Sequence, residues 1–266
     1  MIYELFEEYI VLETFFGTIM INTPIFVLCC AAGMLLVEKA FPGRQYSARK
    51  HWWPRALLLN GAQALIAVTA AVTWDQWLAQ IRLFNLEDLS LHLQVLIGYL
   101  SITFIYYWWH RARHEIPFLW RWFHQVHHSP ARLEIFTSFY KHPLEIFFNS
   151  ILSTSVLMVL LGLSATATIV TVLITGIAEL FYHWNVRTPY WLGFIFQRPE
   201  SHCIHHKKNH HKNNYSDLPV WDMLFGTFEN PRYQPSHCGF SARQELALYE
   251  MLCGVDVIKK GARNAG

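Results

Sequence analysis

Long apolar runs recur along the chain, and three of them have the length that a membrane-crossing helix needs. A helix requires about 20 apolar residues to cross the roughly 30 Å of hydrocarbon in a bilayer. These runs lie at Ile19–Val37, Ala56–Thr73 and Leu89–Trp109. The third ends in four aromatic residues at 106–109, and aromatic side chains gather at membrane–water boundaries. The pattern predicts a membrane-spanning helix over each range.

A fourth apolar block, Ile146–Trp184, is too long for a single span and contains one charged residue, Glu179. A Leu-Gly-Leu-Ser segment at 161–164 interrupts it. We expect a hairpin of two helices here, which either crosses the membrane fully or enters and leaves from one side. Together the runs predict an all-α fold, a multi-pass membrane bundle of about four to five hydrophobic helices.

Composition agrees with a chain whose surface faces a bilayer. Hydrophobic residues make up 53% of the 266 residues and charged residues 15%, whereas soluble domains carry about a quarter charged residues. The formal net charge of +2 is too small to indicate nucleic-acid binding. The five cysteines form no CxxC pair, so the sequence predicts no disulfide framework and favours a reducing compartment.

The distribution of charge predicts an orientation. Residues 38–55 carry five basic side chains and one acidic one, while residues 80–90 carry one basic and two acidic ones. The positive-inside rule then places 38–55 in the cytoplasm. After the third span the chain returns to that side for residues 110–142, and the hairpin returns residues 185–266 to it. We therefore expect the polar segments at 110–142 and 185–266 to form a cytoplasmic cap.

Histidines are concentrated in this predicted cap. The chain has fifteen, and eight of them fall in the five-residue windows HRARH, HQVHH and HCIHH. Residues three or four apart share one face of a helix, so each window can direct its rings to one place. Adjacent residues such as His127 and His128 point about 100° apart. That divergence suits two metal ions better than one. The eight are His110, His114, His124, His127, His128, His202, His205 and His206.

The end of the last hydrophobic helix adds a further pair. In the segment ELFYH, Glu179 and His183 are four residues apart, which brings the number of converging imidazoles to nine. An ionisable group at membrane depth is by default a functional-site hypothesis, and a metal or its bound water is a natural partner for Glu179. We predict a catalytic role for this carboxylate.

The remaining histidines have simpler interpretations. His51, His92 and His237 stand alone and are interpreted as structural. His210 and His211 follow the third window in a stretch rich in lysine and asparagine. We interpret them as solvated or as supporting the ligands, with ligation as the alternative.

The chemistry of the ligand set narrows the class of site. Imidazole suits iron, zinc, copper and nickel. A structural zinc site needs four ligands, usually including cysteine, so nine histidines exceed it. A dinuclear, nearly all-imidazole site with open positions suits the activation of dioxygen. Beside a bilayer, the substrate within reach is a lipid such as an acyl chain, a sterol or another isoprenoid.

The order and spacing of these motifs resemble the sterol desaturase and fatty acid hydroxylase superfamily, whose members are membrane histidine-box di-iron oxygenases. The resemblance covers roughly residues 90–231. It includes HxxxH, HxxHH, a histidine after the hydrophobic hairpin, a second HxxHH, and the signature NYSDLPVWDMLFGT that begins at Asn214. The segment KHPLE resembles an HPxE element of the family, which makes His142 a candidate ligand, supporting group or catalytic residue.

The resemblance implies that residues 19–231 form the membrane-embedded catalytic domain, between an N-terminal interfacial segment at 1–18 and a cytoplasmic C-terminal tail at 232–266. It implies that the nine histidines bind two iron ions, with zinc as an occupant after isolation, and that O2 is the co-substrate. Some related hydroxylases have a histidine where this chain has Glu179, so nine histidines plus a carboxylate or water are expected. The electron donor is expected to be a separate small haem, ferredoxin or flavin reductase-type protein.

Two other classes of protein use histidine-rich membrane segments. A metal transporter needs polar ligands through the bilayer, and the first three predicted spans offer almost none. A bis-histidine haem carrier needs single histidines that face each other in mid-helix rather than dense windows. The sequence favours a lipid hydroxylase or desaturase, with a histidine-rich metal transporter or metal-binding protein as the alternative.

Overall fold

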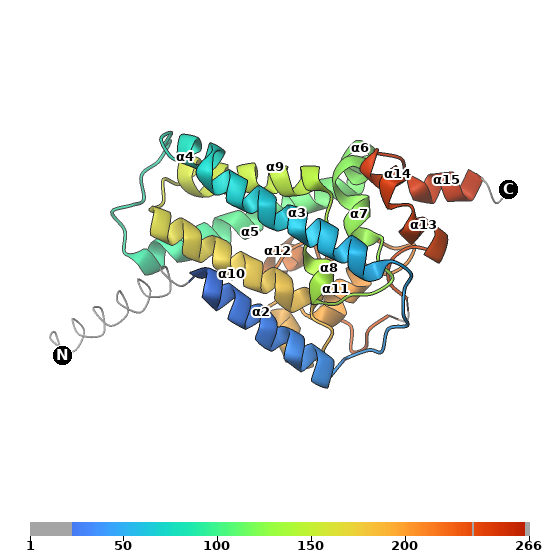
Figure 1. Cartoon of the computed structure of the whole chain (residues 1–266). Coiled ribbons are helices and arrows are strands. Elements are labelled where there is room, and N and C mark those ends of the chain that lie inside the picture. Colours follow the sequence, from blue (N-terminus) through green and yellow to red (C-terminus); the bar gives the residue numbers. More distant parts are fainter. Residues whose placement is uncertain (1–22, 236, 264–266) are drawn as a thin grey trace.

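The computed structural model describes residues 23–235 and 237–263, and these fold into helices of very unequal length (Figure 1). Their only strand-like pairing is an isolated antiparallel bridge between Lys207 and Cys238. The helices are α2 Thr23–Ala40, α3 Trp52–Val72, α4 Trp74–Leu78, α5 Leu91–Glu115, α6 Pro117–Leu119, η1 Trp120–His124, α7 Gln125–His128, α8 Ile135–Ser138, α9 Pro143–Thr154, η2 Ser155–Leu160, α10 Ala165–His183, η3 Tyr190–Phe194, α11 Pro199–His205, α12 Pro219–Leu224, α13 Ala242–Leu246, α14 Leu248–Leu252 and α15 Val257–Arg263.

Four helical segments among these residues are long and apolar enough to cross a membrane: Trp52–Leu78, α5, Pro143–Leu160 and α10. In Figure 1, α5 lies along α10 and α3 lies along α9, which forms the membrane bundle. The outer faces of these helices remain apolar and exposed, as at Leu65 of α3 and Leu96 of α5. Apolar side chains on the outside of a bundle match a hydrocarbon solvent. The predicted all-α membrane bundle is confirmed.

The second and third predicted spans correspond to α3 and α5. Helix α2 covers the described part of the first, whose residues 19–22 lie outside the described residues, as does the N-terminal segment 1–18. Helix α5 runs six residues beyond the predicted end at Trp109 and ends at Glu115, because Ile116 adopts an extended conformation before Pro117. The first histidine window therefore lies on the last turns of a membrane helix.

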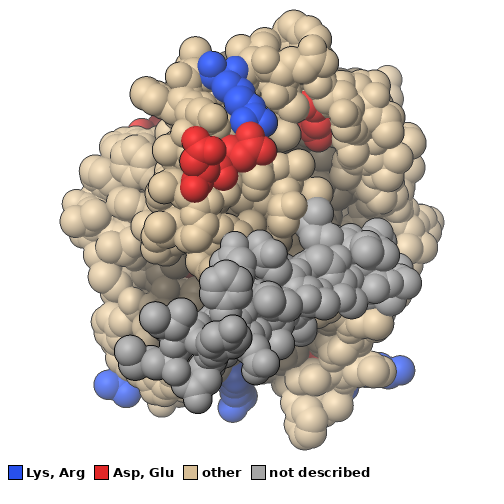
Figure 2. All heavy atoms as spheres, turned by 90° about the vertical axis from the view of Figure 1, so that its left-hand side faces the viewer, with Lys and Arg blue, Asp and Glu red and all other residues tan. Residues whose placement is uncertain are grey.

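The predicted hairpin is also confirmed. Its two arms are α9 with η2 and α10, and the chain reverses over residues 161–164. The loop before α5 pairs with this reversal, since the backbone N–H of Leu86 donates to the carbonyl of Leu161 at 3.2 Å. The buried side chain of Gln94 accepts from the N–H of Ser164 at 2.9 Å and so fixes α5 to the start of α10. Figure 2 shows few charged side chains on the face that includes this end of the bundle.

At the opposite end, the short helices of the C-terminal part pack against the bundle. Trp52 of α3, Val126 of α7 and Met251 of α14 belong to one buried cluster. A buried ion pair joins Arg55 of α3 to Glu245 of α13 at 3.1 Å. These contacts close the end of the bundle at which the histidines lie.

Gly162 allows the hairpin to turn, and its substitution provides a test of the fold. Its φ of +61° is unfavourable for other residues, and an added Cβ would lie 2.0 Å from the carbonyl oxygen of Phe84. We expect Gly162→Ala to lower the unfolding temperature by several degrees. Gly61→Ala is the matched control, because a Cβ at that helical position meets no atom within 4 Å. Equal unfolding temperatures for the two variants would contradict this account of the turn.

Candidate metal centre

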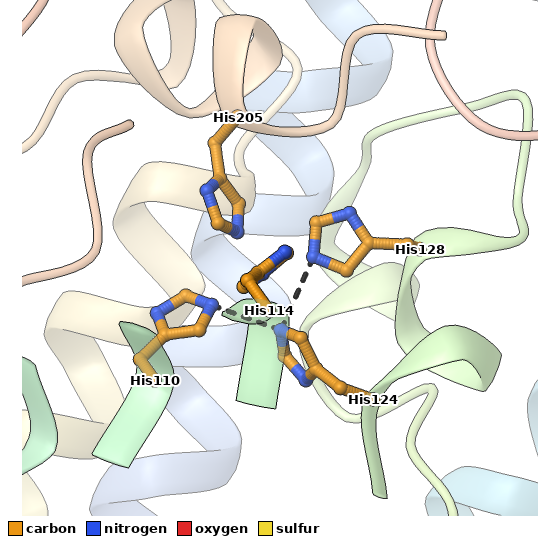
Figure 3. Close-up of side chains that lie close together, drawn as sticks. All are labelled: His110, His114, His124, His128 and His205. Atoms are coloured by element: carbon orange, nitrogen blue, oxygen red, sulfur yellow. Dashed lines mark hydrogen bonds between the residues drawn. The ribbon is translucent and has the colours of Figure 1, made fainter. Parts of the chain in front are cut away.

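The structure brings all nine predicted histidines together at one end of the bundle, in two groups. Within each group, one nitrogen from every ring lies within 4.8 Å of the others. The larger group is drawn in Figure 3 and comprises His110, His114, His124, His128 and His205. The smaller group comprises His127, His183, His202 and His206.

Helical spacing explains how the histidines of each window are divided between the two groups. His110 and His114 are one turn apart on α5 and enter the same group, as do His202 and His206 at the end of α11. The neighbours His127 and His128 enter different groups. The pair His205 and His206 is divided in the same way. The fold thus separates neighbouring histidines into two groups, while the assignment of one ion to each group stays a prediction.

The Nε2 atoms face one another across each group. In the larger group, Nε2 of His124 lies 2.9 Å from that of His110 and 3.1 Å from that of His128. In the smaller group, Nε2 of His202 lies 3.1 Å from the Nε2 atoms of His183 and His206. Two nitrogens bound at about 2.1 Å to one ion, at a right angle, are about 3 Å apart. The spacing fits ligands that share an ion.

The outer ring nitrogens show which nitrogen carries the lone pair. Nδ1 of His110 lies 2.8 Å from the carbonyl of Tyr215, Nδ1 of His183 lies 2.8 Å from that of Glu179, and Nδ1 of His205 lies 2.7 Å from that of Asn213. A carbonyl can only accept, so each Nδ1 must carry the proton. In the neutral ring Nε2 then presents its lone pair to the centre of the group. This is the arrangement that a metal-binding histidine adopts.

The environment keeps these rings neutral. Burial, followed by the nearby rings, lowers the pKa of His127, His202 and His206 well below the ordinary value, and burial lowers that of His205 to about 3. Nε2 of His205 and Nε2 of His114 are buried and have no hydrogen-bond partner. Buried neutral rings whose nitrogen lone pairs converge without any hydrogen-bond donor are unfavourable unless a cation lies among them. The site therefore fits transition metals that prefer imidazole.

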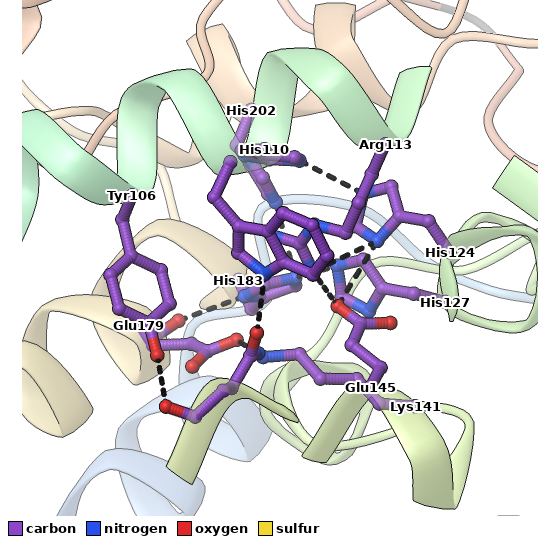
Figure 4. A network of polar contacts seen from close by, with 12 residues as sticks. Tyr106, His110, Arg113, His124, His127, Lys141, Glu145, Glu179, His183 and His202 are labelled. Atoms are coloured by element: carbon purple, nitrogen blue, oxygen red, sulfur yellow. Dashed lines mark hydrogen bonds and ion pairs between the residues drawn. The ribbon is translucent and has the colours of Figure 1, made fainter. Parts of the chain in front are cut away.

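A buried ion pair holds one of these rings, as Figure 4 shows. Oε1 of Glu145 lies 3.1 Å from Nδ1 of His124 and also accepts from the guanidinium of Arg113. All three side chains are buried. Carboxylates that bind the outer nitrogen of a ligand fix its orientation and increase its basicity. Sequence reasoning missed this role, although Glu145 is the acidic residue of the KHPLE segment that had been singled out.

The other predicted site residues lie outside both groups. His142 begins α9, where its Nδ1 accepts from the N–H of Leu144 at 3.0 Å and its Nε2 donates to the carbonyl of Leu252 at 3.2 Å. The carboxylate of Glu179 forms an ion pair with Lys141, while its backbone carbonyl orients His183. Neither His142 nor Glu179 contributes a side-chain atom to either histidine group. Their predicted catalytic roles stay predictions.

His211 contacts the larger group, which the sequence left open. Its Nδ1 lies 3.2 Å from Nδ1 of His128, and its ring packs on Trp120 and Phe240. Burial lowers its pKa to about 4, so this ring is also neutral. His51, His92, His210 and His237 belong to neither group. No spacing signal distinguishes His211 from His210, since only the fold of the loop places one of them beside a ligand.

The signature that follows the third window supports the centre from outside. The carboxylate of Asp222 accepts from the N–H groups of Tyr215 and Ser216 at 2.8 and 3.0 Å. The side chain of Asn214 donates to the carbonyls of Ser201 and Glu229. These bonds fix the loop whose Asn213 and Tyr215 carbonyls hold His205 and His110. The signature therefore acts as a scaffold for the histidine groups.

Fold and site together define a helical membrane protein with a nine-histidine centre in two groups. The chain matches the fatty acid hydroxylase family over residues 95–227, and it belongs to that family. No solved structure matches it.

Two curated proteins are similar to it over about half of its length. Alkylglycerol monooxygenase from Homo sapiens is 32% identical over 136 residues, which are 50% of this chain and 30% of that protein. Ornithine lipid hydroxylase OlsE from Rhizobium tropici is 36% identical over 143 residues, which are 52% of this chain and 42% of that protein. The matches thus span less than half of each relative.

The division of adjacent histidines between the groups gives a direct prediction. We expect the purified chain to hold two transition-metal ions, and His205→Ala and His206→Ala to lower the content by about one ion each, from different groups. Elemental analysis of the purified variants measures this. Combining either substitution with His128→Ala separates the cases, because His205 and His128 share a group and His206 and His128 do not. His237→Ala is the control. Loss of both ions in every single variant would contradict two separate groups.

Proposed function

We propose that this chain is a membrane-bound non-haem di-iron oxidoreductase that uses O2 and external electrons to hydroxylate or desaturate a lipid. The observation that carries the proposal is the pair of all-imidazole groups at the end of a membrane bundle. Membership of the fatty acid hydroxylase family supports it, and so do the two relatives, an alkylglycerol monooxygenase and an ornithine lipid hydroxylase. Those names favour hydroxylation over desaturation.

Bound iron would supply the redox chemistry that activates dioxygen. In hydroxylation, one oxygen atom enters a C–H bond and the other leaves as water, with two electrons and two protons from outside. In desaturation, two hydrogen atoms leave neighbouring carbons and both oxygen atoms leave as water, with the same two electrons and two protons from outside. Because the reaction needs two electrons from outside, the proposal includes a separate donor protein of the small haem, ferredoxin or flavin reductase type.

The residues of the chain would hold, orient and shield the centre. The nine histidines would bind the ions, and the carbonyls behind Nδ1 of His110, His183 and His205 would keep those three rings in place. Arg113 and Glu145 would preserve the geometry of His124. His183 and His202 are fully or nearly fully buried against Tyr182, which limits access of water from the membrane side.

The proposal places the centre at the cytoplasmic face and the catalytic domain at residues 19–231. The excess of basic residues at 38–55 supports the orientation, because this segment lies at the histidine end of α3. The span of the family match, residues 95–227, supports the extent of the domain. Zinc, which imidazole also binds, is a plausible substitute for iron after isolation.

Lipid analysis tests the proposed activity. We expect cells that express the chain in air to contain a lipid heavier by one oxygen atom, or lighter by two hydrogen atoms, than its precursor. Cells with His127→Ala should lose at least 90% of that product, as expected when a metal ligand is removed (about a tenfold effect or more). Cells with His237→Ala should retain it, since this residue is in neither group. Identical lipid profiles for all three would contradict the proposal.

A further inference from the structure

Two short segments of the C-terminal part carry apolar side chains on their outer surfaces. The first is η3 with the residues that follow it, where Trp191, Phe194 and Ile195 are more than half exposed. The second is α12, where Leu224 is 65% exposed and Val220 is also exposed. Helices η3 and α12 contact each other. Their exposed apolar side chains form one patch, here called the η3–α12 patch: Trp191, Phe194, Ile195, Val220, Leu224 and Phe225.

The sequence of both segments leaves this patch without exposed charge. Residues 189–197 contain no charged side chain. Residues 218–228 contain only Asp222, which is buried and accepts from the N–H groups of Tyr215 and Ser216. Soluble proteins rarely expose a contiguous apolar surface of this kind, so the patch requires a partner that covers it.

Contacts with α5 fix the depth of α12 relative to the membrane bundle. Nε1 of Trp221 donates to Oγ1 of Thr103 at 3.0 Å, and the Trp221 ring packs on Phe104 with centroids 5.0 Å apart. Thr103 lies six residues before Trp109, where the apolar run of α5 ends, which is about 9 Å along the helix. In Figure 1, α12 lies among the bundle helices, whereas α13 and α15 lie beyond their end. Helix α12 is therefore at the depth of the membrane-crossing part of α5.

The patch also continues the lipid-facing surface of α5. The ring of Phe225 packs on that of Trp108 with centroids 4.7 Å apart, and both side chains are partly exposed. Leu100, further into the same membrane helix, is exposed as well. At the edge of the patch, the exposed Arg232 lies over the ring of Tyr190, 4.7 Å from its centre. Aromatic rings and arginine side chains gather at the level of the lipid headgroups.

From this depth and continuity we propose that the η3–α12 patch is embedded in the bilayer, where the hydrocarbon of the leaflet at the histidine end covers it. An apolar face that enters a membrane from one side commonly lies about 5–10 Å below the headgroup boundary, which agrees with the depth of α12. The expected cytoplasmic cap at 185–266 would then lose two segments to the membrane. This placement is independent of the proposed oxidation of a lipid.

Embedding of the patch bears on the histidines, because its two segments flank the third window. Helix η3 precedes α11, which carries His202 and His205, and α12 follows the loop whose carbonyls hold His205 and His110. The bilayer would thus hold both ends of the segment that supplies histidines to the two groups.

Quenching of a fluorophore by labelled lipid tests the embedding. The full chain, with Cys29, Cys30 and Cys253 replaced by serine, would carry one NBD label on Trp191→Cys or Leu224→Cys in phosphatidylcholine nanodiscs. A nitroxide at carbon 5 of the acyl chain should quench either label about threefold more than it quenches a label beyond the bundle, because both positions would lie in hydrocarbon.

Two reference positions define the scale of this quenching. Tyr249→Cys lies on α14 and is the reference for water, since Tyr249 is 80% exposed beyond the bundle. Leu100→Cys on α5 is the reference for lipid. Quenching at Trp191→Cys and Leu224→Cys as weak as at Tyr249→Cys would overturn the proposal. Blue-shifted emission without lipid quenching would also overturn it, since protein, such as a second copy of the chain, would then cover the patch.

Matched leucine substitutions test the same contact in the unlabelled chain. Leu224→Asp would place a charge in hydrocarbon and should lower the unfolding temperature in nanodiscs by several degrees. Leu246→Asp makes the same change on α13, where the exposed side chain faces water, and should leave the unfolding temperature unchanged. If both variants unfold at the temperature of the parent chain, α12 does not contact hydrocarbon and the proposal fails.

Discussion

The packing of nine imidazoles into two groups, with ring nitrogens that converge within each group, is the constraint on which the rest of the structure depends. Such a cluster is unfavourable by itself, because buried acceptors face one another without donors, as at Nε2 of His205. A bound cation makes the same cluster favourable, because each lone pair then binds the ion. The fold must therefore hold the rings in place strongly enough to keep the site assembled, and backbone carbonyls, the Arg113–Glu145 ion pair and the Asp222 loop provide that support.

The membrane bundle meets two opposite demands. Its outer faces are apolar because they contact hydrocarbon, whereas its interior carries ion pairs beside the histidines. Helix α5 joins the two environments, since its middle belongs to the bundle and its last turns carry His110 and His114. Extending a membrane helix into the site fixes these two side chains more rigidly than a loop would.

Much of this could be predicted from the sequence. Apolar run lengths gave α3, α5 and the hairpin, and helical spacing gave the division of His127 and His128 between groups. The contacts that support the histidines were harder to predict, because they join residues that are distant in the chain. Glu145 reaches His124 across 21 positions, and Lys141 meets Glu179 across 38. Nothing local marks such partners, so a metal was the expected partner of Glu179 and the lysine was overlooked.

The central claim is that two metal ions lie in two separate histidine groups. Anomalous X-ray scattering at the iron absorption edge, from crystals of the iron-loaded chain, tests it most directly. We expect two peaks, one among His110, His114, His124, His128 and His205 and the other among His127, His183, His202 and His206. A single peak shared by both groups, or peaks outside them, would contradict it.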